Sequence, residues 1–311
     1  MERPRPLIID TDPALGVIHD GRPRDVDDAF AIVEALRAPE LDVRAITVTF
    51  GNAPLEAATV VAETLVARAG VAVPVAQGQA AALPDSGLPP RTAAVDLLHA
   101  TLGTTRCRIA ALGPLGNLGA LLLHHPEDAH AIEEVVIVGG RSRNHAFYLG
   151  EVGPVRDFNF ENDVRAARIL LESGVPVTCA GFELSSPVAM TSDHLDAIAA
   201  QGTELGRWLV DGARPWLEHW VRNFPADAGF HPWDSAAICW LRSPELIAQE
   251  ARGWRIRDVE IRPSPGNPDQ SPQRVPWLET DPSFEGRLTF LRGFHADADA
   301  RFLETLVASC R

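Results

Sequence analysis

The sequence contains no lysine, so all 28 of its basic residues are arginines. A Walker-type phosphate-binding loop, a Schiff-base nucleophile and a pyridoxal-phosphate site all need a lysine, and these three classes are therefore excluded. Acidic residues number 42, and the formal net charge is −14. This charge argues against a nucleic-acid partner, because proteins that bind nucleic acids present a basic face.

Cysteines and long apolar runs are scarce as well. The four cysteines lie far apart and form no Cys-x-x-Cys pair. This usage is typical of reduced thiols in a cytoplasmic protein and not of a disulfide or zinc framework. The chain has no 18-residue apolar run, and its first residues lead into a β-branched segment without a signal-peptide pattern. We therefore expect a cytoplasmic protein with no membrane partner.

Short apolar, β-branched runs alternate with helical patterns along the first three-quarters of the chain. We expect strands at 7–9, 43–48, 71–75, 108–111, 134–138 and 175–179, and helices that include 27–37, 54–69 and 163–172. This alternation predicts an α/β fold with an open, mainly parallel sheet and helices on both of its faces. Ligands bind at the carboxyl ends of such strands, so the polar residues that follow each strand are the candidates for a site.

The last third of the chain departs from this alternation. Residues 205–222 have the pattern of a long, Trp-rich helix that Pro215 is expected to bend or restart. Residues 257–276 begin as a strand and become rich in Pro, Gln and Asp, as in a surface hairpin or loop, and 297–309 predict a closing amphipathic helix. Because no repeat or linker interrupts the chain, we expect residues 1–311 to form a single domain with a loop-rich cap.

Aspartates gather where a sheet of this kind binds ligands. Asp10 and Asp12 end the first expected strand, and Asp25, Asp27 and Asp28 open the helix that follows a long loop. Capping explains one aspartate at a helix start, but this many buried carboxylates would repel one another unless a cation or protons neutralise them. Since no His or Cys cluster accompanies them, the pattern indicates Ca²⁺ or Mg²⁺ and disfavours zinc.

An ordered series of motifs resembles that of the calcium-dependent nucleoside hydrolases. The motifs are Asp-Thr-Asp-Pro at 10–13 with Asp-Asp at 27–28, Thr-Val-Thr-Phe-Gly-Asn at 47–52, Gly-Pro-Leu-Gly-Asn at 113–117, Val-Val-Ile-Val-Gly-Gly at 135–140, Arg-Asp-Phe-Asn at 156–159 and Pro-Trp-Asp at 232–234. One pair of aspartates would be a weak signal, but motifs in a shared order are a strong one. The resemblance implies an enzyme that cleaves the N-glycosidic bond of ribonucleosides with a Ca²⁺-activated water, releasing ribose and the free base.

The resemblance also implies roles for individual residues. Asp12, Asp28, Asp234 and the main-chain carbonyl of Leu112 would bind Ca²⁺, and Asp12 would accept the proton of the attacking water. Asp10 would lie behind Asp12 and orient it. The substrate would be contacted by a larger set, namely Asp27, Asn52, Val138, Glu151, Asp157, Phe158 and Asn159.

Several departures from the family pattern affect this assignment. The first loop is much longer than usual, so Asp25 is an alternative to Asp27. Asp157 and Glu151 stand where the family has Glu and Asn, and Val138 replaces a Met. The Asn that Glu151 replaces is the residue that would contact the 5′-hydroxyl.

The group that helps the base to leave has more than one candidate. Trp233 stands where many family members have the His that protonates the base, and its indole can stack broadly on a purine, which predicts a preference for purine nucleosides. His231 is the alternative acid, although a lone histidine is more often structural. Trp216 and Trp220, four residues apart on one helical face, either line the base pocket or anchor their helix.

Other functions stay open from the sequence alone. A Mg²⁺-dependent phosphohydrolase would use Asp10 as its nucleophile, but such enzymes normally need a lysine partner. The replaced residues are compatible with a catalytically impaired nucleoside- or ribose-binding protein on the same fold, and a hydrolase of another N-riboside is also compatible. The family suggests a homodimer or a homotetramer.

Overall fold

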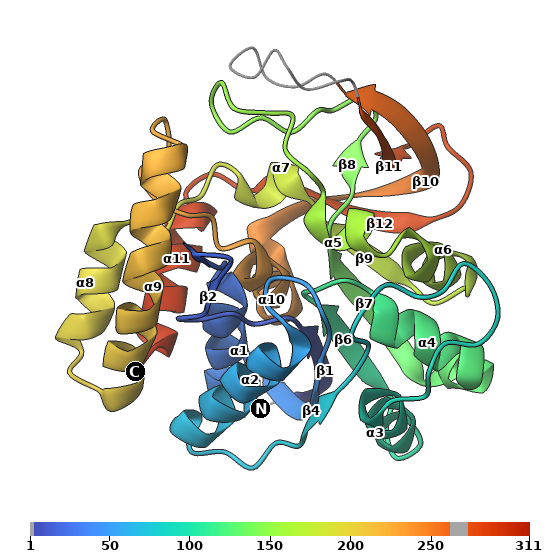
Figure 1. Cartoon of the computed structure of the whole chain (residues 1–311), viewed down its shortest axis with the longest axis horizontal. Coiled ribbons are helices and arrows are strands. Elements are labelled where there is room, and N and C mark those ends of the chain that lie inside the picture. Colours follow the sequence, from blue (N-terminus) through green and yellow to red (C-terminus); the bar gives the residue numbers. More distant parts are fainter. Residues whose placement is uncertain (1–2, 262–272) are drawn as a thin grey trace.

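The computed structural model describes residues 3–261 and 273–311 and has a ten-stranded sheet at its centre (Figure 1). The strand order is β5-β4-β1-β6-β7-β9-β12-β10-β11-β8. Neighbouring strands from β5 to β12 in this order are parallel, whereas β10 is antiparallel to both β12 and β11. The prediction of an open, mainly parallel sheet is confirmed. The strands of the sheet are β1 Arg5–Thr11, β4 Leu41–Val48, β5 Val75–Gln77, β6 Cys107–Ala111, β7 Ile132–Val138, β8 Arg141–Ser142, β9 Val177–Ala180, β10 Ile247–Ile261, β11 Gln273–Asp281 and β12 Leu288–Phe294.

Helices cover both faces of this sheet, as predicted. One apolar core packs against α1, α2 and α8 to α11, and a second core packs against α3, α4 and α6. Strand β1 supplies both cores because its side chains alternate: Leu7 and Ile9 join the first, and Ile8 joins the second. The helices are α1 Asp27–Arg37, α2 Leu55–Ala69, α3 Ala93–Leu102, α4 Gly116–His124, α5 Phe158–Asn162, α6 Val164–Glu172, α7 Phe182–Ser185, α8 Ser192–Ala200, α9 Glu204–Asn223, α10 Trp233–Arg242 and α11 Ala298–Ser309, with 3₁₀ turns η1 Pro126–Ala131 and η2 Pro244–Leu246.

Two of the predicted elements differ from the structure in detail. The strand expected over 71–75 is instead β5, which begins at Val75, because Pro74 has no N–H to donate to a neighbouring strand. Helix α9 continues through Pro215 and does not restart there. Pro215 has no N–H to donate to the Asp211 carbonyl, and both residues lie on the exposed side of the helix.

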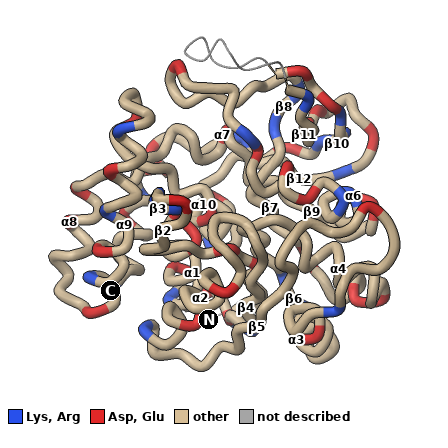
Figure 2. The backbone as a smooth tube through the Cα atoms, viewed as in Figure 1, with Lys and Arg blue, Asp and Glu red and all other residues tan. Residues whose placement is uncertain are grey.

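The predicted surface hairpin is present as the antiparallel pair β10 and β11. Residues 262–272 between these strands lie outside the described part of the chain. Arginines gather around β8, β10 and β11, whereas acidic segments are spread over the rest of the backbone (Figure 2). This end of the sheet therefore carries a local group of positive charges in a chain whose net charge is negative.

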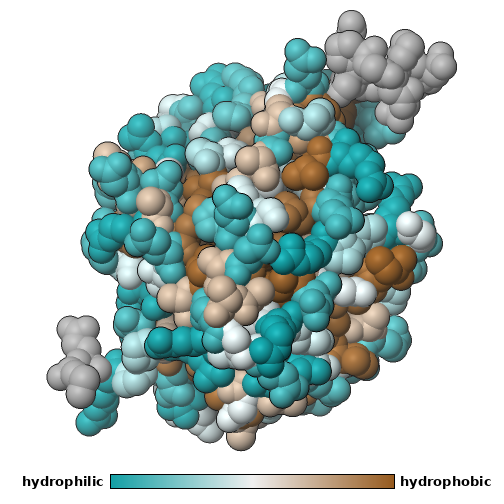
Figure 3. Space-filling model, turned by 90° about the vertical axis from the view of Figure 1, so that its left-hand side faces the viewer, coloured by the Kyte–Doolittle hydropathy of each residue, from teal (hydrophilic) through white to brown (hydrophobic). Residues whose placement is uncertain are grey.

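The side of the molecule that carries α8 and α9 is mainly hydrophilic, with hydrophobic patches between the polar side chains (Figure 3). Within residues 3–261 and 273–311, no helix combines the length and the apolar character that crossing a bilayer requires.

Candidate active site

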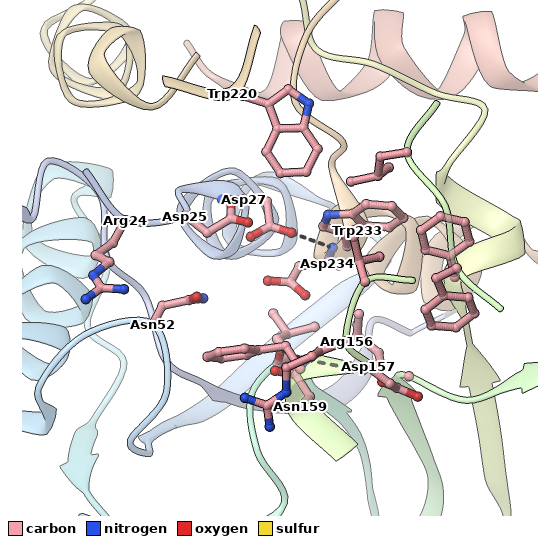
Figure 4. A pocket seen from close by; sticks show the side chains of 18 of the residues that line it. Arg24, Asp25, Asp27, Asn52, Arg156, Asp157, Asn159, Trp220, Trp233 and Asp234 are labelled. Carbon is pink, nitrogen blue, oxygen red and sulfur yellow. Dashed lines mark hydrogen bonds between the residues drawn. The ribbon is translucent and has the colours of Figure 1, made fainter. Parts of the chain in front are cut away.

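A cavity of about 410 Å³ opens at the carboxyl ends of the parallel strands, where the fold predicts a ligand site. Its volume is typical of small-molecule sites. Acidic, amide and aromatic side chains converge on it from several elements (Figure 4). The predicted site residues that line it are Asp27, Asn52, Leu112, Val138, Asp157, Phe158, Asn159, Trp216, Trp220, Trp233 and Asp234.

Asp27 and Asp234, which line the floor of the cavity, form a compact acidic cluster with Asp28, which does not line it. Oxygen atoms of Asp27, Asp28 and Asp234 lie within 4.8 Å of one another, and all three residues are buried. Asp27 and Asp28 begin α1, and Asp234 lies in the first turn of α10, so the dipoles of two helices favour their negative charges. The Asp234 N–H donates to Oδ2 of Asp27 at 3.3 Å, which joins the starts of the two helices.

Asp12 lies beside this cluster, directly after β1. Its N–H donates to Oδ1 of Asp28 at 3.1 Å, and its Oδ2 accepts the N–H of Asn52 at 2.6 Å. Its Oδ1 is buried without a hydrogen-bond partner among the described residues. Glycines make room for this carboxylate, since a Cβ at Gly51 would lie 1.9 Å from Oδ2 and one at Gly113 would lie 2.6 Å from Oδ1. The backbone therefore holds one oxygen of Asp12 and leaves the other free.

Burial and mutual repulsion raise the pKa of these carboxyls. Desolvation is the largest cause for Asp12, Asp27 and Asp234, and the nearby carboxylates are the next contribution in each case. Buried charges of one sign need a counter-charge, and the donors here are oxygens of hard character. The arrangement fits a hard divalent cation.

Asp10 lies behind the cluster and does not line the cavity. Its Oδ1 accepts hydrogen bonds from the Thr47 hydroxyl at 2.6 Å and from Nδ2 of Asn117 at 2.7 Å. Burial raises its pKa to about 7. These contacts tie β1 to β4 and α4, and they keep Asp10 away from any substrate in the cavity. A phosphohydrolase mechanism with Asp10 as the nucleophile therefore finds no support.

Asn159 joins the ends of two central strands. Its Nδ2 donates to the carbonyl of Leu112 at 2.6 Å and to that of Val138 at 3.2 Å. A carbonyl oxygen has a second lone pair, so Leu112 keeps the capacity to bind a cation. Asp157, two residues earlier, accepts the N–H of Gly140 at 2.8 Å, and burial raises its pKa to about 6.

Aromatic side chains form the wall that faces the acidic floor. Trp233 stacks on Phe182 with ring centres 5.4 Å apart, and Phe182 stacks on Phe147 at 4.2 Å. Trp216 and Trp220 of α9 line the same cavity, so both helix residues face it. A flat aromatic ligand would find stacking partners on this side.

His231 is buried and does not line the cavity. Its Nδ1 lies 2.7 Å from the carbonyl of Val188 and its Nε2 lies 3.3 Å from the carboxylate of Asp227, which also accepts the indole N–H of Trp220. The His231 ring packs against Trp233 and edge-on against Trp220. Both ring nitrogens of His231 therefore have partners, and its ring supports two tryptophans that line the cavity.

The structure does not place Glu151 at the cavity. Glu151 is exposed in the turn that the Leu149–Val152 bridge closes, and the cavity is lined there by Leu149 and Val155. Asp25, the alternative to Asp27, lines the cavity, but its Oδ1 accepts the N–H of Val26 at 2.7 Å.

Several lining residues are absent from the sequence-based set: Arg22, Arg24, Phe147, Arg156 and Phe182. The unusual length of the first loop was the one signal that could have pointed to the first two. The two phenylalanines lie outside the motifs that carry the resemblance, and Arg156 stands at a motif position to which no role had been given.

The family model described as "Inosine-uridine preferring nucleoside hydrolase" matches residues 7–274. The chain belongs to this family. It is therefore a nucleoside hydrolase, an enzyme that hydrolyses N-glycosidic bonds. Nucleosides are accordingly its substrate class.

Named relatives support this membership. The chain is 32% identical over 264 residues to the pyrimidine-specific ribonucleoside hydrolase RihA of Citrobacter koseri. The alignment covers 77% of this chain and 83% of that protein. Among solved structures, a plant nucleoside hydrolase superposes with a TM-score of 0.78 at 23% identity, covering 98% of this chain and 99% of that one. The purine-preferring ribonucleoside hydrolase of Gardnerella vaginalis gives 0.77 at 21% identity, with the same coverage. At these identities the two structures establish the fold.

Adding Ca²⁺ to the metal-free enzyme is expected to raise its Tm, and by more at pH 8 than at pH 5. Folding raises the pKa values of the cluster above those of the unfolded chain. Without a cation, the protonated cluster therefore stabilises the folded state at low pH, and this stabilisation is lost as the pH rises from the unfolded-state pKa values through the folded-state ones. A cation must displace those protons, so it binds best at high pH. At a free Ca²⁺ concentration a hundred times the Kd, binding raises the free energy of unfolding by about 2.7 kcal/mol.

Thermal unfolding with Ca²⁺ or with a chelator at the two pH values provides the measurement. Asp234→Asn should remove most of the Ca²⁺-induced shift, whereas Asp85→Asn, in an exposed loop, should keep it. An equal shift in both variants would place the cation elsewhere.

Proposed function

We propose that the nucleoside hydrolase is Ca²⁺-dependent and prefers purine ribonucleosides. The observation that carries the proposal is the buried cluster of Asp27, Asp28 and Asp234, with Asp12 and its unpartnered oxygen beside it, in a cavity whose wall contains Trp233. These carboxylates and the Leu112 carbonyl would hold the ion. When bound there, Ca²⁺ would lower the pKa of a water and fix the ribose 2′- and 3′-hydroxyls.

Asp12 is the residue best suited to accept the proton of the attacking water. Its Oδ2 is fixed by the Asn52 N–H, so the free Oδ1 keeps one orientation and needs no reorganisation. The ribose hydroxyls would be held by Asp27, Asn52 and Asn159, which lie around the floor. Water and sugar would then be oriented by separate groups.

The same carboxylates would favour the transition state. Breaking the N-glycosidic bond places positive charge on the ribosyl carbon, and fixed negative charge and amide oxygens nearby stabilise it. Direct attack by water needs no covalent intermediate, as in inverting glycosidases. Asp12 is thus proposed as a base and not as a nucleophile.

The purine preference rests on the aromatic wall. A purine presents a larger ring to Trp233 than a pyrimidine does, and its N7 can be protonated by solvent. The two ring nitrogens of His231 are bound to the Val188 carbonyl and the Asp227 carboxylate. This favours a mechanism in which the base leaves while stacked on Trp233, without a dedicated acid. One relative is named as pyrimidine-specific and one structural neighbour as purine-preferring, so uridine and inosine are the substrates to compare.

Asp12→Asn is expected to lower kcat for ribose release by roughly 10²- to 10⁴-fold, because the amide keeps the shape but neither accepts the proton nor carries the charge. Ribose release from inosine provides the measurement, and circular dichroism confirms the fold. Asp85→Asn is the matched control in an exposed loop. Turnover within tenfold of the wild type would remove Asp12 from the role of base. A wild-type protein that binds ribose without releasing it from nucleosides would be a binding protein.

Trp233→Ala is expected to lower kcat/KM for inosine more than for uridine. The difference between the two losses, expressed as a free energy of activation, should be about 1–3 kcal/mol, the magnitude of one base–aromatic stacking contact. His231→Ala should have a smaller effect, since it acts only through the two tryptophans. Trp208→Ala is the matched control, because Trp208 lies on α9 outside the cavity lining. The stacking account fails if uridine is the best substrate or if His231→Ala is the more damaging change.

A further inference from the structure

The long loop between β1 and α1 forms a two-stranded ribbon at the cavity rim. Its strands are β2 Ile18–His19 and β3 Arg22–Pro23, which pair antiparallel. The base of the ribbon rests on α9, where a Cβ at Gly212 would lie 2.7 Å from the Leu15 side chain. The main-chain N–H of Arg24 donates to the carbonyl of Val17 at 3.1 Å. Packing and hydrogen bonds therefore fix where the ribbon places its side chains.

The ribbon brings two arginines to the cavity. Arg22 and Arg24 both line it. Figure 4 shows Arg24 and, from another wall, Arg156. Within the described residues, the Arg22 side chain makes no hydrogen bond, ion pair or ring contact. Among the described residues, the Arg24 side chain forms its one hydrogen bond and ion pair with the exposed Asp20, at 3.3 Å, and its Nε is buried without a partner. The guanidinium groups of Arg22 and Arg24 therefore have N–H donors without a protein acceptor among the described residues.

These arginines are not the counter-ions of the acidic floor. Within residues 3–261 and 273–311, neither Arg22 nor Arg24 forms an ion pair with Asp12, Asp27 or Asp28. The chain as a whole carries a net charge of −14, which repels anions in general. Guanidinium groups at the mouth of an acidic cavity form a local exception, and their planar donors match carboxylate and phosphate geometry.

We propose that Arg22 and Arg24 select N-ribosides that carry an anionic group, either a carboxylate or a phosphate. The inference deepens the proposed hydrolysis and rests on it, because the anion is recognised while the ribose occupies the floor of the same cavity. Both guanidinium groups donate to the anion at the rim.

Calorimetric binding of fragments that cannot be hydrolysed tests the proposal on the Ca²⁺-loaded full chain. Ribose is compared with ribose 5-phosphate, and uracil with orotate. The acidic member of at least one pair should bind roughly ten- to a hundredfold more tightly, as for charge-assisted hydrogen bonds. A preference in the first pair identifies a phosphate on the sugar, and one in the second identifies a carboxylate on the base.

Because a bound cation also attracts anions, the variants decide the source of the preference. The double variant Arg22→Gln/Arg24→Gln should lose the acidic-to-neutral affinity ratio, and Arg168→Gln, an exposed arginine of α6, should retain it. An unchanged ratio in the double variant, or no preference in the wild type, overturns the proposal even if uridine is hydrolysed. Conversely, a preference that the double variant abolishes supports the anion site, even if no ribose is released from nucleosides and the proposed function fails.

Discussion

Repulsion between aspartates that are buried side by side is the constraint on which the rest of the site depends. Asp12, Asp27, Asp28 and Asp234 are brought together by the end of β1 and by the first turns of α1 and α10. Helix dipoles and main-chain N–H groups offset part of the electrostatic cost, but burial still raises the pKa values. A divalent cation would remove the remaining imbalance, and in the proposed function it would give water and ribose their places.

The cavity divides its chemistry among regions that the fold supplies separately. The carboxyl edge of the parallel sheet provides the acidic floor, where bond cleavage is proposed. The wall is built from α7, α9 and α10, and its tryptophans are held from behind by His231 and Asp227. The rim comes from the inserted ribbon. A change in the wall or the rim can therefore alter which nucleoside is accepted without altering the floor.

Contiguous motifs made much of the floor predictable from the sequence. Asp27 and Asp28 open a helix that begins where the pattern indicated. Asp234 also lies in the first turn of a helix, the one that begins directly after Pro232. Residues whose role depends on distant contacts were not predictable. Nδ1 of His231 is bound by the Val188 carbonyl, 43 residues away in the chain. Glu151 was missed for a local reason, because it lies exposed in the short turn between Leu149 and Val152. The placement of Arg22 and Arg24 depends on how the ribbon packs against α9, which no local pattern encodes.

A crystal structure with Ca²⁺ and ribose, with the ion located by anomalous diffraction, tests the central claim most directly. The account predicts one ion at the acidic floor, bound by Asp12, Asp28, Asp234 and the Leu112 carbonyl, with the ribose diol completing its shell. An ion held mainly by Asp25 or by histidines would contradict the assignment across the long loop. No ion at the floor at saturating Ca²⁺ would contradict the account as a whole.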